Sequence, residues 1–245
     1  MTDFSNAINK YLDRHGFGSF APKAVLFDMD GVIYNSMPFH AIAWEKSMTE
    51  QGIHMTRADA YLYEGMRGVE TIKKLFKDQK GIIISDEESE HYYAIKSQYF
   101  AEQGYAPKMA GVEALMRQLK DWGMTLCVVT GSGQQTLLDR LESDFLGLLH
   151  RHLMVTSHDV SHGKPAPDPY LMGLSKCGVQ PWEAIVVENA PMGVRAAEAA
   201  RIFTVAVNTG PLPDSMLWEA GASLVEHSMD DFRQHLQKWY QHKTH

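Results

Sequence analysis

Three absences narrow the class of this protein. The 245 residues include only two cysteines, Cys127 and Cys177, without CxxC spacing, so neither a disulfide framework nor a cysteine metal site is expected. The longest apolar stretches have the length of a strand, which predicts no transmembrane helix. The first sixteen residues, MTDFSNAINKYLDRHG, lack a basic start followed by an apolar block, so we expect no signal peptide. These features favour a cytoplasmic protein with reduced, buried thiols.

An excess of basic charge is also missing. The formal net charge is −7, which argues against broad binding to nucleic acid or to anionic membranes. A small phosphorylated ligand stays possible, because a few local cations and a metal ion suffice to hold it. With 44% hydrophobic and 22% charged residues, the composition is that of a globular protein with one large domain or two smaller ones. We expect a monomer.

The hydrophobic pattern predicts an α/β fold. Residues 1–20 predict a short amphipathic helix and a loop, and 23–28 predict a first strand. From about 38 to 104 the spacing is helical, and after Pro107 strands alternate with helices, which indicates a Rossmann-like parallel sheet covered on both faces. We therefore predict a core domain of residues 1–37 and 106–245 with an inserted helical cap of residues 38–105. The segment 82–84 (Ile-Ile-Ile) fits either a short strand or a loop.

Two carboxylates end the first predicted strand. Asp28 and Asp30 follow the apolar run 24–27 and precede Gly31. Burying such charges without a partner is costly, so we expect a divalent cation between them and chemistry on phosphate. In open α/β sheets ligands bind beyond the carboxyl ends of the strands, where three further polar motifs also fall.

Two of those motifs suit an anion. Thr130-Gly131-Ser132-Gly133 offers a hydroxyl and backbone amides before a helix, although turns of this composition are common. The proline-rich loop 163–169 holds Lys164 ahead of a helix, where the ammonium could neutralise a phosphoryl oxygen. An exposed lysine in a rigid helix-entry loop is the alternative.

The last motif suits a hard cation. Glu188 and Asn189 follow a third strand and supply acidic and amide oxygens of the kind that Mg²⁺ prefers. Asn189 could equally cap the helix that follows.

In this order, the motifs resemble the haloacid dehalogenase superfamily of phosphotransferases, and the resemblance covers the chain from Lys23 onward. A helical cap after the first motif (C1 type) is similar to the β-phosphoglucomutase-like subfamily. The resemblance implies that Asp28 is the nucleophile that forms an aspartyl-phosphate and that Asp30 is the general acid and base. It also implies Mg²⁺ held by Asp28, the Asp30 carbonyl, Glu188 and Asn189, with Thr130, Gly131 and Lys164 on the phosphoryl group.

The cap loop departs from the mutase pattern. Where β-phosphoglucomutases carry a lysine and, four residues on, an arginine for a distal phosphate, this sequence has Glu64 and Gly68. The neighbouring Arg67 is a partial substitute. Glu64 could instead reach the cation, which suits a small substrate; a solvated charge at a helix end is the alternative. The stretch 206–212 (AVNTGPL) is similar to a branch associated with inorganic pyrophosphate hydrolysis.

His40 and Asn189 complete the hypothesis. In mutases a histidine at the position of His40 lies near the acid/base aspartate, so His40 could tune Asp30, unless it is a surface residue. Asn189 replaces the usual aspartate, which removes one negative charge and should weaken metal binding. We expect a phosphohydrolase acting on pyrophosphate or on a small phosphorylated metabolite. A β-phosphoglucomutase is the first alternative, and a non-catalytic phosphate-binding protein is the second.

Overall fold

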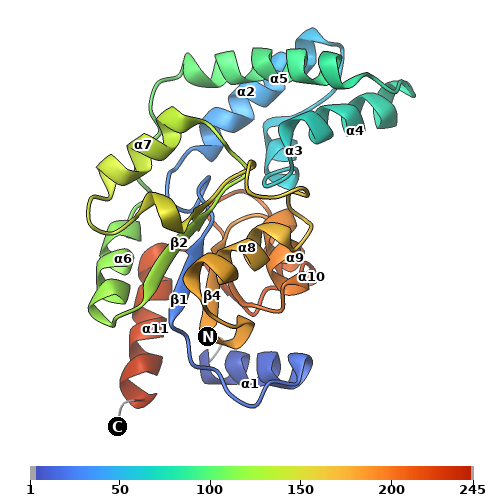
Figure 1. The fold of residues 1–245 in the computed structure, drawn as a ribbon. Coiled ribbons are helices and arrows are strands. Elements are labelled where there is room, and N and C mark those ends of the chain that lie inside the picture. Colours follow the sequence, from blue (N-terminus) through green and yellow to red (C-terminus); the bar gives the residue numbers. More distant parts are fainter. Residues whose placement is uncertain (1–3, 244–245) are drawn as a thin grey trace.

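Six strands form one parallel sheet in the computed structural model, which describes residues 4–243 (Figure 1). Their order is β3-β2-β1-β4-β5-β6, so the sheet grows in opposite directions from β1. The predicted Rossmann-like fold class is confirmed. The strands are β1 (Ala24–Phe27), β2 (Thr125–Val129), β3 (Met154–Val155), β4 (Ala184–Glu188), β5 (Phe203–Val207) and β6 (Leu224–Glu226).

The register of the central strands brings the motifs to one level. Phe27 in β1 lies beside Val128 in β2 and Val187 in β4. Asp28, the end of β2 and Glu188 therefore reach the same edge of the sheet. The order reverses between β1 and β4, and such a switch point leaves a crevice at the carboxyl ends where ligands bind.

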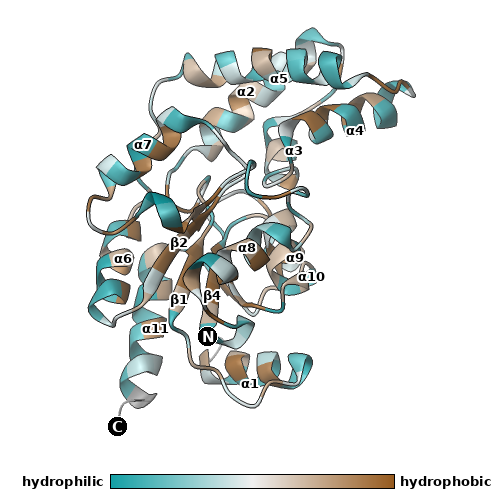
Figure 2. Cartoon of the chain, viewed as in Figure 1, coloured by the Kyte–Doolittle hydropathy of each residue, from teal (hydrophilic) through white to brown (hydrophobic). Residues whose placement is uncertain are grey.

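Helices cover both faces because both faces of the central strands are apolar (Figure 2). Val25 and Phe27 pack on one side, and Ala24 and Leu26 on the other. This strict alternation follows from the two-residue period of a strand. The first face carries α1 (Phe4–His15), α6 (Val112–Asp121), α7 (Gln135–Asp144) and α11 (Met229–Lys243); the second carries α8 (Asp168–Cys177), α9 (Pro191–Ala199) and α10 (Asp214–Glu219).

Four helices lie between β1 and α6 and cross over the carboxyl ends of the strands (Figure 1). Two of them start at capping boxes, Thr56 with Asp59 and Ser85 with Glu88. They surround their own apolar cluster, which is separate from those of the sheet and supports the proposed division at residues 38 and 105. The cap helices are α2 (Met37–Glu50), α3 (Arg57–Leu62), α4 (Gly68–Lys80) and α5 (Asp86–Ala101).

Three further details of the fold bear on the predictions made from the sequence. Residues 82–84 form a loop rather than a strand, with Ile83 86% exposed. The helix α10 was not predicted, because six residues are too few to show a helical period. No helix within residues 4–243 combines the length and apolar character needed to cross a bilayer.

Candidate active site

Asp28 lies directly beyond β1 with its side chain only 7% exposed. Its backbone N–H donates to the Val187 carbonyl oxygen at 3.0 Å, which extends the sheet by one residue and fixes where the carboxylate points. The chain then turns at Gly31, whose φ is +80°. A Cβ at Gly31 would lie 2.0 Å from Asn189 Nδ2, so only glycine lets these two segments meet.

Lys164 joins the carboxylates of two strands. Its Nζ donates to Asp28 Oδ1 at 2.5 Å and to Glu188 Oε1 at 2.6 Å, and its side chain is 2% exposed. Burial would lower the pKa of Lys164, but the charges of Asp28 and Glu188 raise it above its ordinary value. The lysine is therefore a fixed, buried cation at the nucleophile position, and not the exposed helix-entry residue of the alternative interpretation.

Both carboxylate oxygens of Glu188 accept hydrogen bonds from protein groups. Oε1 accepts from Lys164 and from the Tyr170 hydroxyl at 2.7 Å, and Oε2 accepts from the backbone N–H groups of Asn189 and Ala190 at 3.0 and 3.3 Å. Glu188 therefore holds Lys164 and the turn after β4, at the same sheet edge as Asp28.

Gly193 makes room for that carboxylate. A Cβ at Gly193 would lie 1.7 Å from Glu188 Oε1, so the first turn of α9 can pass only if this residue has no side chain. The glycine of the ENAPMG sequence is thus a steric requirement of the site.

Asn189 provides the observation that fits a cation. Its Oδ1 is buried without a hydrogen-bond partner, although an unpaired buried polar atom costs free energy. An amide oxygen at the same sheet edge as the Asp28 carboxylate suits Mg²⁺. The residues present therefore fit a magnesium ion held by Asp28, the Asp30 carbonyl, Glu188 and Asn189.

The buried carboxylates also call for positive charge. Burial, together with the charge of Glu188, raises the pKa of Asp28 to about 7, and Lys164 only partly opposes this. One ammonium group is shared by two carboxylates, so a negative charge remains. A divalent cation would favour the ionised form of Asp28.

Asp30 takes its partners from the cap and the linker that leads to it. Ser36 Oγ donates to Asp30 Oδ1 at 2.5 Å, and His40 Nε2 lies 3.2 Å from the same oxygen. Burial would raise the pKa of Asp30, but His40 and the hydrogen bonds from His40 and Ser36 lower it below its ordinary value. His40 is therefore not a surface residue.

Lys96 on α5 completes this chain of contacts. Its Nζ lies 2.6 Å from His40 Nδ1, and only 4% of the residue is exposed. An ammonium can only donate, so we assign Nδ1 as the acceptor and Nε2–H as the donor to Asp30. Burial and Lys96 lower the pKa of His40, and burial lowers that of Lys96 to about 8.

Thr130 and Gly131 line a cavity together with Lys164, Gly65 and Arg67. The Thr130 hydroxyl accepts from the Ser132 N–H at 3.1 Å, which shapes the turn after β2. The cavity measures about 10 Å³, room for about one water molecule. The cap loop thus lies close over Thr130, Gly131 and Lys164.

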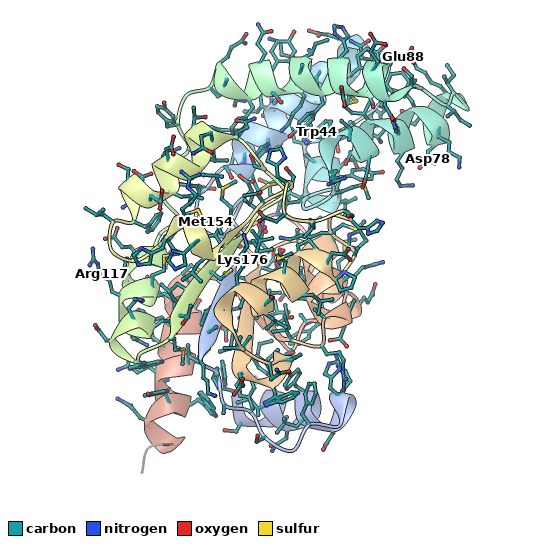
Figure 3. All side chains as sticks on the ribbon, viewed as in Figure 1. Trp44, Asp78, Glu88, Arg117, Met154 and Lys176 are labelled. Carbon is teal, nitrogen blue, oxygen red and sulfur yellow. The ribbon has the colours of Figure 1, made fainter. Side chains whose placement is uncertain are left out.

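The segment 157–164, which we term the lysine loop, is anchored from the core. Lys176 on α8 donates to the Met154 carbonyl oxygen at 2.6 Å and to Asp159 Oδ1 at 2.7 Å (Figure 3). The other Asp159 oxygen accepts from the Thr156 N–H and hydroxyl at 2.8 and 2.7 Å. Lys164 therefore extends from a loop that charged hydrogen bonds attach to the core.

The two cap-loop candidates, Glu64 and Arg67, lie in different surroundings. Glu64 is half-buried, and burial with the charges of Asp30 and Asp28 raises its pKa well above the ordinary value. It thus lies within electrostatic range of both catalytic candidates. Arg67 lines the cavity, but its Nη2 donates to the carbonyl oxygens of Ser157 and Val160 at 3.3 and 3.2 Å.

Sequence reasoning missed three residues of the site: Ser36, Lys96 and Tyr170. Lys96 was detectable, because it shares the inward face of α5 with the buried Ser89 and the half-buried Tyr93. A lysine on such a face needs a buried partner. Ser36 and Tyr170 have no comparable signal.

The fold and this constellation of strand-end residues define a phosphoryl-transfer enzyme class. Residues 25–207 match the family model described as haloacid dehalogenase-like hydrolase. Hexitol phosphatase A of Escherichia coli (strain K12) is 30% identical, over 85% of this chain and 92% of that protein. The chain belongs to the haloacid dehalogenase-like hydrolase family, as the sequence motifs predicted.

Two further similarities concern mutases. A solved structure described as "Putative beta-phosphoglucomutase from Bacteroides vulgatus" is 47% identical with a TM-score of 0.91, covering 96% of this chain and 95% of that one. Beta-phosphoglucomutase of Bacillus subtilis (strain 168) is 26% identical over 90% of this chain and 97% of that protein. The family thus includes phosphatases and a mutase.

Proposed function

We propose that the chain is a Mg²⁺-dependent phosphohydrolase that works through an aspartyl-phosphate on Asp28. The observation that carries this proposal is the buried ammonium of Lys164, 2.5 Å from Asp28 Oδ1 and 2.6 Å from Glu188 Oε1. A fixed cation at that point offsets charge on both the nucleophile and an incoming phosphoryl group.

The proposed hydrolysis has two displacement steps, one by Asp28 and one by water. An Asp28 oxygen attacks phosphorus and the bond from phosphorus to the leaving oxygen breaks. Asp30 must first bind a proton, because His40 and Ser36 favour its ionised form, and it gives that proton to the leaving oxygen. Asp30 then takes a proton from water as the water attacks phosphorus, which releases phosphate and restores the Asp28 carboxylate. The Nε2–H of His40 orients the Asp30 carboxylate between these steps.

Asp28, the Asp30 carbonyl and Asn189 would hold the magnesium ion. When bound, Mg²⁺ shields the nucleophile and the phosphate from their mutual repulsion. Glu188 would complete this ligand set, and it also holds Lys164 in place.

The substrate we favour is a small one, with inorganic pyrophosphate first. The cavity beneath the cap measures about 10 Å³, and the cap residue Arg67 that lines it is already hydrogen-bonded to the core. Glu64, on the same cap loop, is within electrostatic range of Asp28 and Asp30. A second phosphate that carries its own cation suits a carboxylate at the position of Glu64 better than a sugar phosphate does.

A β-phosphoglucomutase is the second candidate. The 47% identity to the Bacteroides vulgatus protein favours it. A mutase must hold both ends of a bisphosphate, for which the positions of Glu64 and Gly68 provide no cation.

Two assays on the Mg²⁺-loaded protein separate the candidates. We expect phosphate release from pyrophosphate and little conversion of β-glucose 1-phosphate to glucose 6-phosphate in a coupled assay. Robust conversion without phosphate release from pyrophosphate would establish the mutase instead. If both activities are absent and beryllium fluoride does not bind at Asp28 in the presence of Mg²⁺, the proposal that the chain catalyses phosphoryl transfer is refuted.

A further inference from the structure

Arg67 is the point where the cap loop is joined to the core. It stands at the N-terminus of α4, and its Nη2 donates to the Ser157 and Val160 carbonyl oxygens at 3.3 and 3.2 Å. Both carbonyls belong to the lysine loop, 90 residues or more further along the chain. Hydrogen bonds from a charged donor are stronger than neutral ones, so these are the contacts expected to hold a mobile element.

The two loops also fit into each other. A Cβ at Gly163 would lie 3.1 Å from Arg67 Cγ, so the stem of the arginine rests on the backbone of the lysine loop. A Cβ at Gly65 would lie 3.2 Å from Lys164 Cδ, so the cap backbone in turn rests on the stem of the lysine. Close contact in both directions requires the small residue on each side.

The partner of Arg67 is itself hydrogen-bonded to the core. The lysine loop is tied to the core at Asp159 by Lys176 at 2.7 Å and by Thr156 at 2.7 and 2.8 Å. A hydrogen bond to this loop therefore fixes the cap loop relative to the sheet. Arg67 also lines the cavity with Thr130 and Lys164, so its position decides how much room a leaving group has.

We propose that Arg67 is a positioning residue that latches the closed cap onto the lysine loop and thereby limits the site to small leaving groups. The limit on leaving groups rests on the proposed function, whereas the latch itself would hold the two loops together whether or not the chain turns substrate over. A bulky leaving group can enter only when both carbonyl contacts are broken.

The test uses Arg67→Met, which keeps an apolar stem on Gly163 and removes every donor. Arg57→Met is the matched control, because Arg57 pairs with Glu45 at 2.7 Å inside the cap and is exposed. Hydrogen exchange followed by mass spectrometry should show faster exchange of the amides at 157–164 and 63–68 in Arg67→Met, with peptides of α5 unchanged. Arg67→Lys, which keeps a charged donor, should restore protection in part.

A second measurement addresses leaving-group size. In Arg67→Met, kcat/KM for pyrophosphate should fall about tenfold, the effect of about 1.4 kcal/mol, while kcat/KM for an aryl phosphate stays level or rises. The exchange experiment needs no turnover, so it remains decisive if the chain proves inactive. Unchanged exchange of the lysine loop in Arg67→Met or, should that variant not fold, full protection in Arg67→Leu, which also lacks any donor, would overturn the latch.

Discussion

Lys96 Nζ lies 2.6 Å from His40 Nδ1, so a buried ammonium of the cap touches the histidine that faces the acid/base candidate of the core. The pair extends the influence of the cap to Asp30 without any direct contact between Lys96 and the carboxylate oxygens. This arrangement lowers the free energy of unfolding, because burial of the ammonium lowers the pKa of Lys96 to about 8 from 10.5.

Lys96→Met should therefore raise stability and lower activity. At pH 7 both the folded and the unfolded wild type carry the proton, so the cost of the buried charge, on the order of 3 kcal/mol, is fully present. Between pH 8 and 10.5 the unfolded chain keeps a proton that the folded chain has released, so wild-type stability rises and the difference between variant and wild type shrinks. Urea unfolding at pH 7 and pH 10 measures this difference.

The exposed Lys46 provides the control for that experiment. Lys46→Met removes a cap lysine whose Nζ lies over the Tyr99 ring at 3.7 Å, and no pH-dependent gain is expected. A Lys96→Met protein that is less stable at pH 7 than the wild type would contradict the assignment of a strained buried charge.

Asp28→Asn should abolish turnover while the fold persists, because an amide is not a nucleophile and cannot form the phosphoryl-enzyme. The shape of the side chain is unchanged, so the melting temperature should not fall. Phosphate release and circular dichroism check the two statements, with the exposed Asp13→Asn as control. Retained turnover in Asp28→Asn would refute the covalent route.

Glu64→Ala should reduce hydrolysis of pyrophosphate more than that of an aryl phosphate. We expect a loss of about tenfold in kcat/KM for pyrophosphate, equivalent to about 1.4 kcal/mol of transition-state binding. Glu70→Ala removes an exposed carboxylate of the same cap loop region and should change neither substrate. Equal losses on both substrates would mean that Glu64 does not select between them.

Asn189→Asp should tighten metal binding, because it adds a charge where a buried Oδ1 lacks a partner. The Mg²⁺ concentration for half-maximal activity should fall. Asn6→Asp adds the same charge on α1, at the end of the molecule opposite the cap, and should leave the Mg²⁺ dependence unaltered (Figure 1). An unchanged Mg²⁺ requirement in Asn189→Asp would exclude this residue as a ligand.

Gly193→Ala should disturb the site through packing alone. The new methyl group would meet Glu188 Oε1 at 1.7 Å, and the strain should cost about 1–3 kcal/mol together with most of the activity. Gly18→Ala meets no atom within 4 Å and is the matched substitution. The urea unfolding midpoints of the two variants measure this difference. Equal midpoints would show that the first turn of α9 can shift to accommodate the methyl group.

The sequence predicts the sheet and the strand-end residues well, for a physical reason. Buried parallel strands are continuous apolar runs, so polar residues that follow them, such as Asp28 and Thr130, stand out. Lys96 and Arg67 lie among other charged residues of a helix and a loop; the spacing on α5 indicates that Lys96 is buried, but it does not identify the partner of either residue. Their partners are 56 and 90 residues away, and only the packed structure brings them together.

Asp28 and Asp30 are close in the chain, yet their side chains contact different parts of the molecule. Lys164 and Glu188 hold Asp28 from the sheet side, whereas Ser36, His40 and Lys96 surround Asp30 from the linker and the cap. A swing of the cap would therefore alter the proton affinity of Asp30 and leave the hydrogen bond between Asp28 and Lys164 in place. Under the proposed mechanism, cap closure would control proton transfer by Asp30 and not the position of the Asp28 carboxylate.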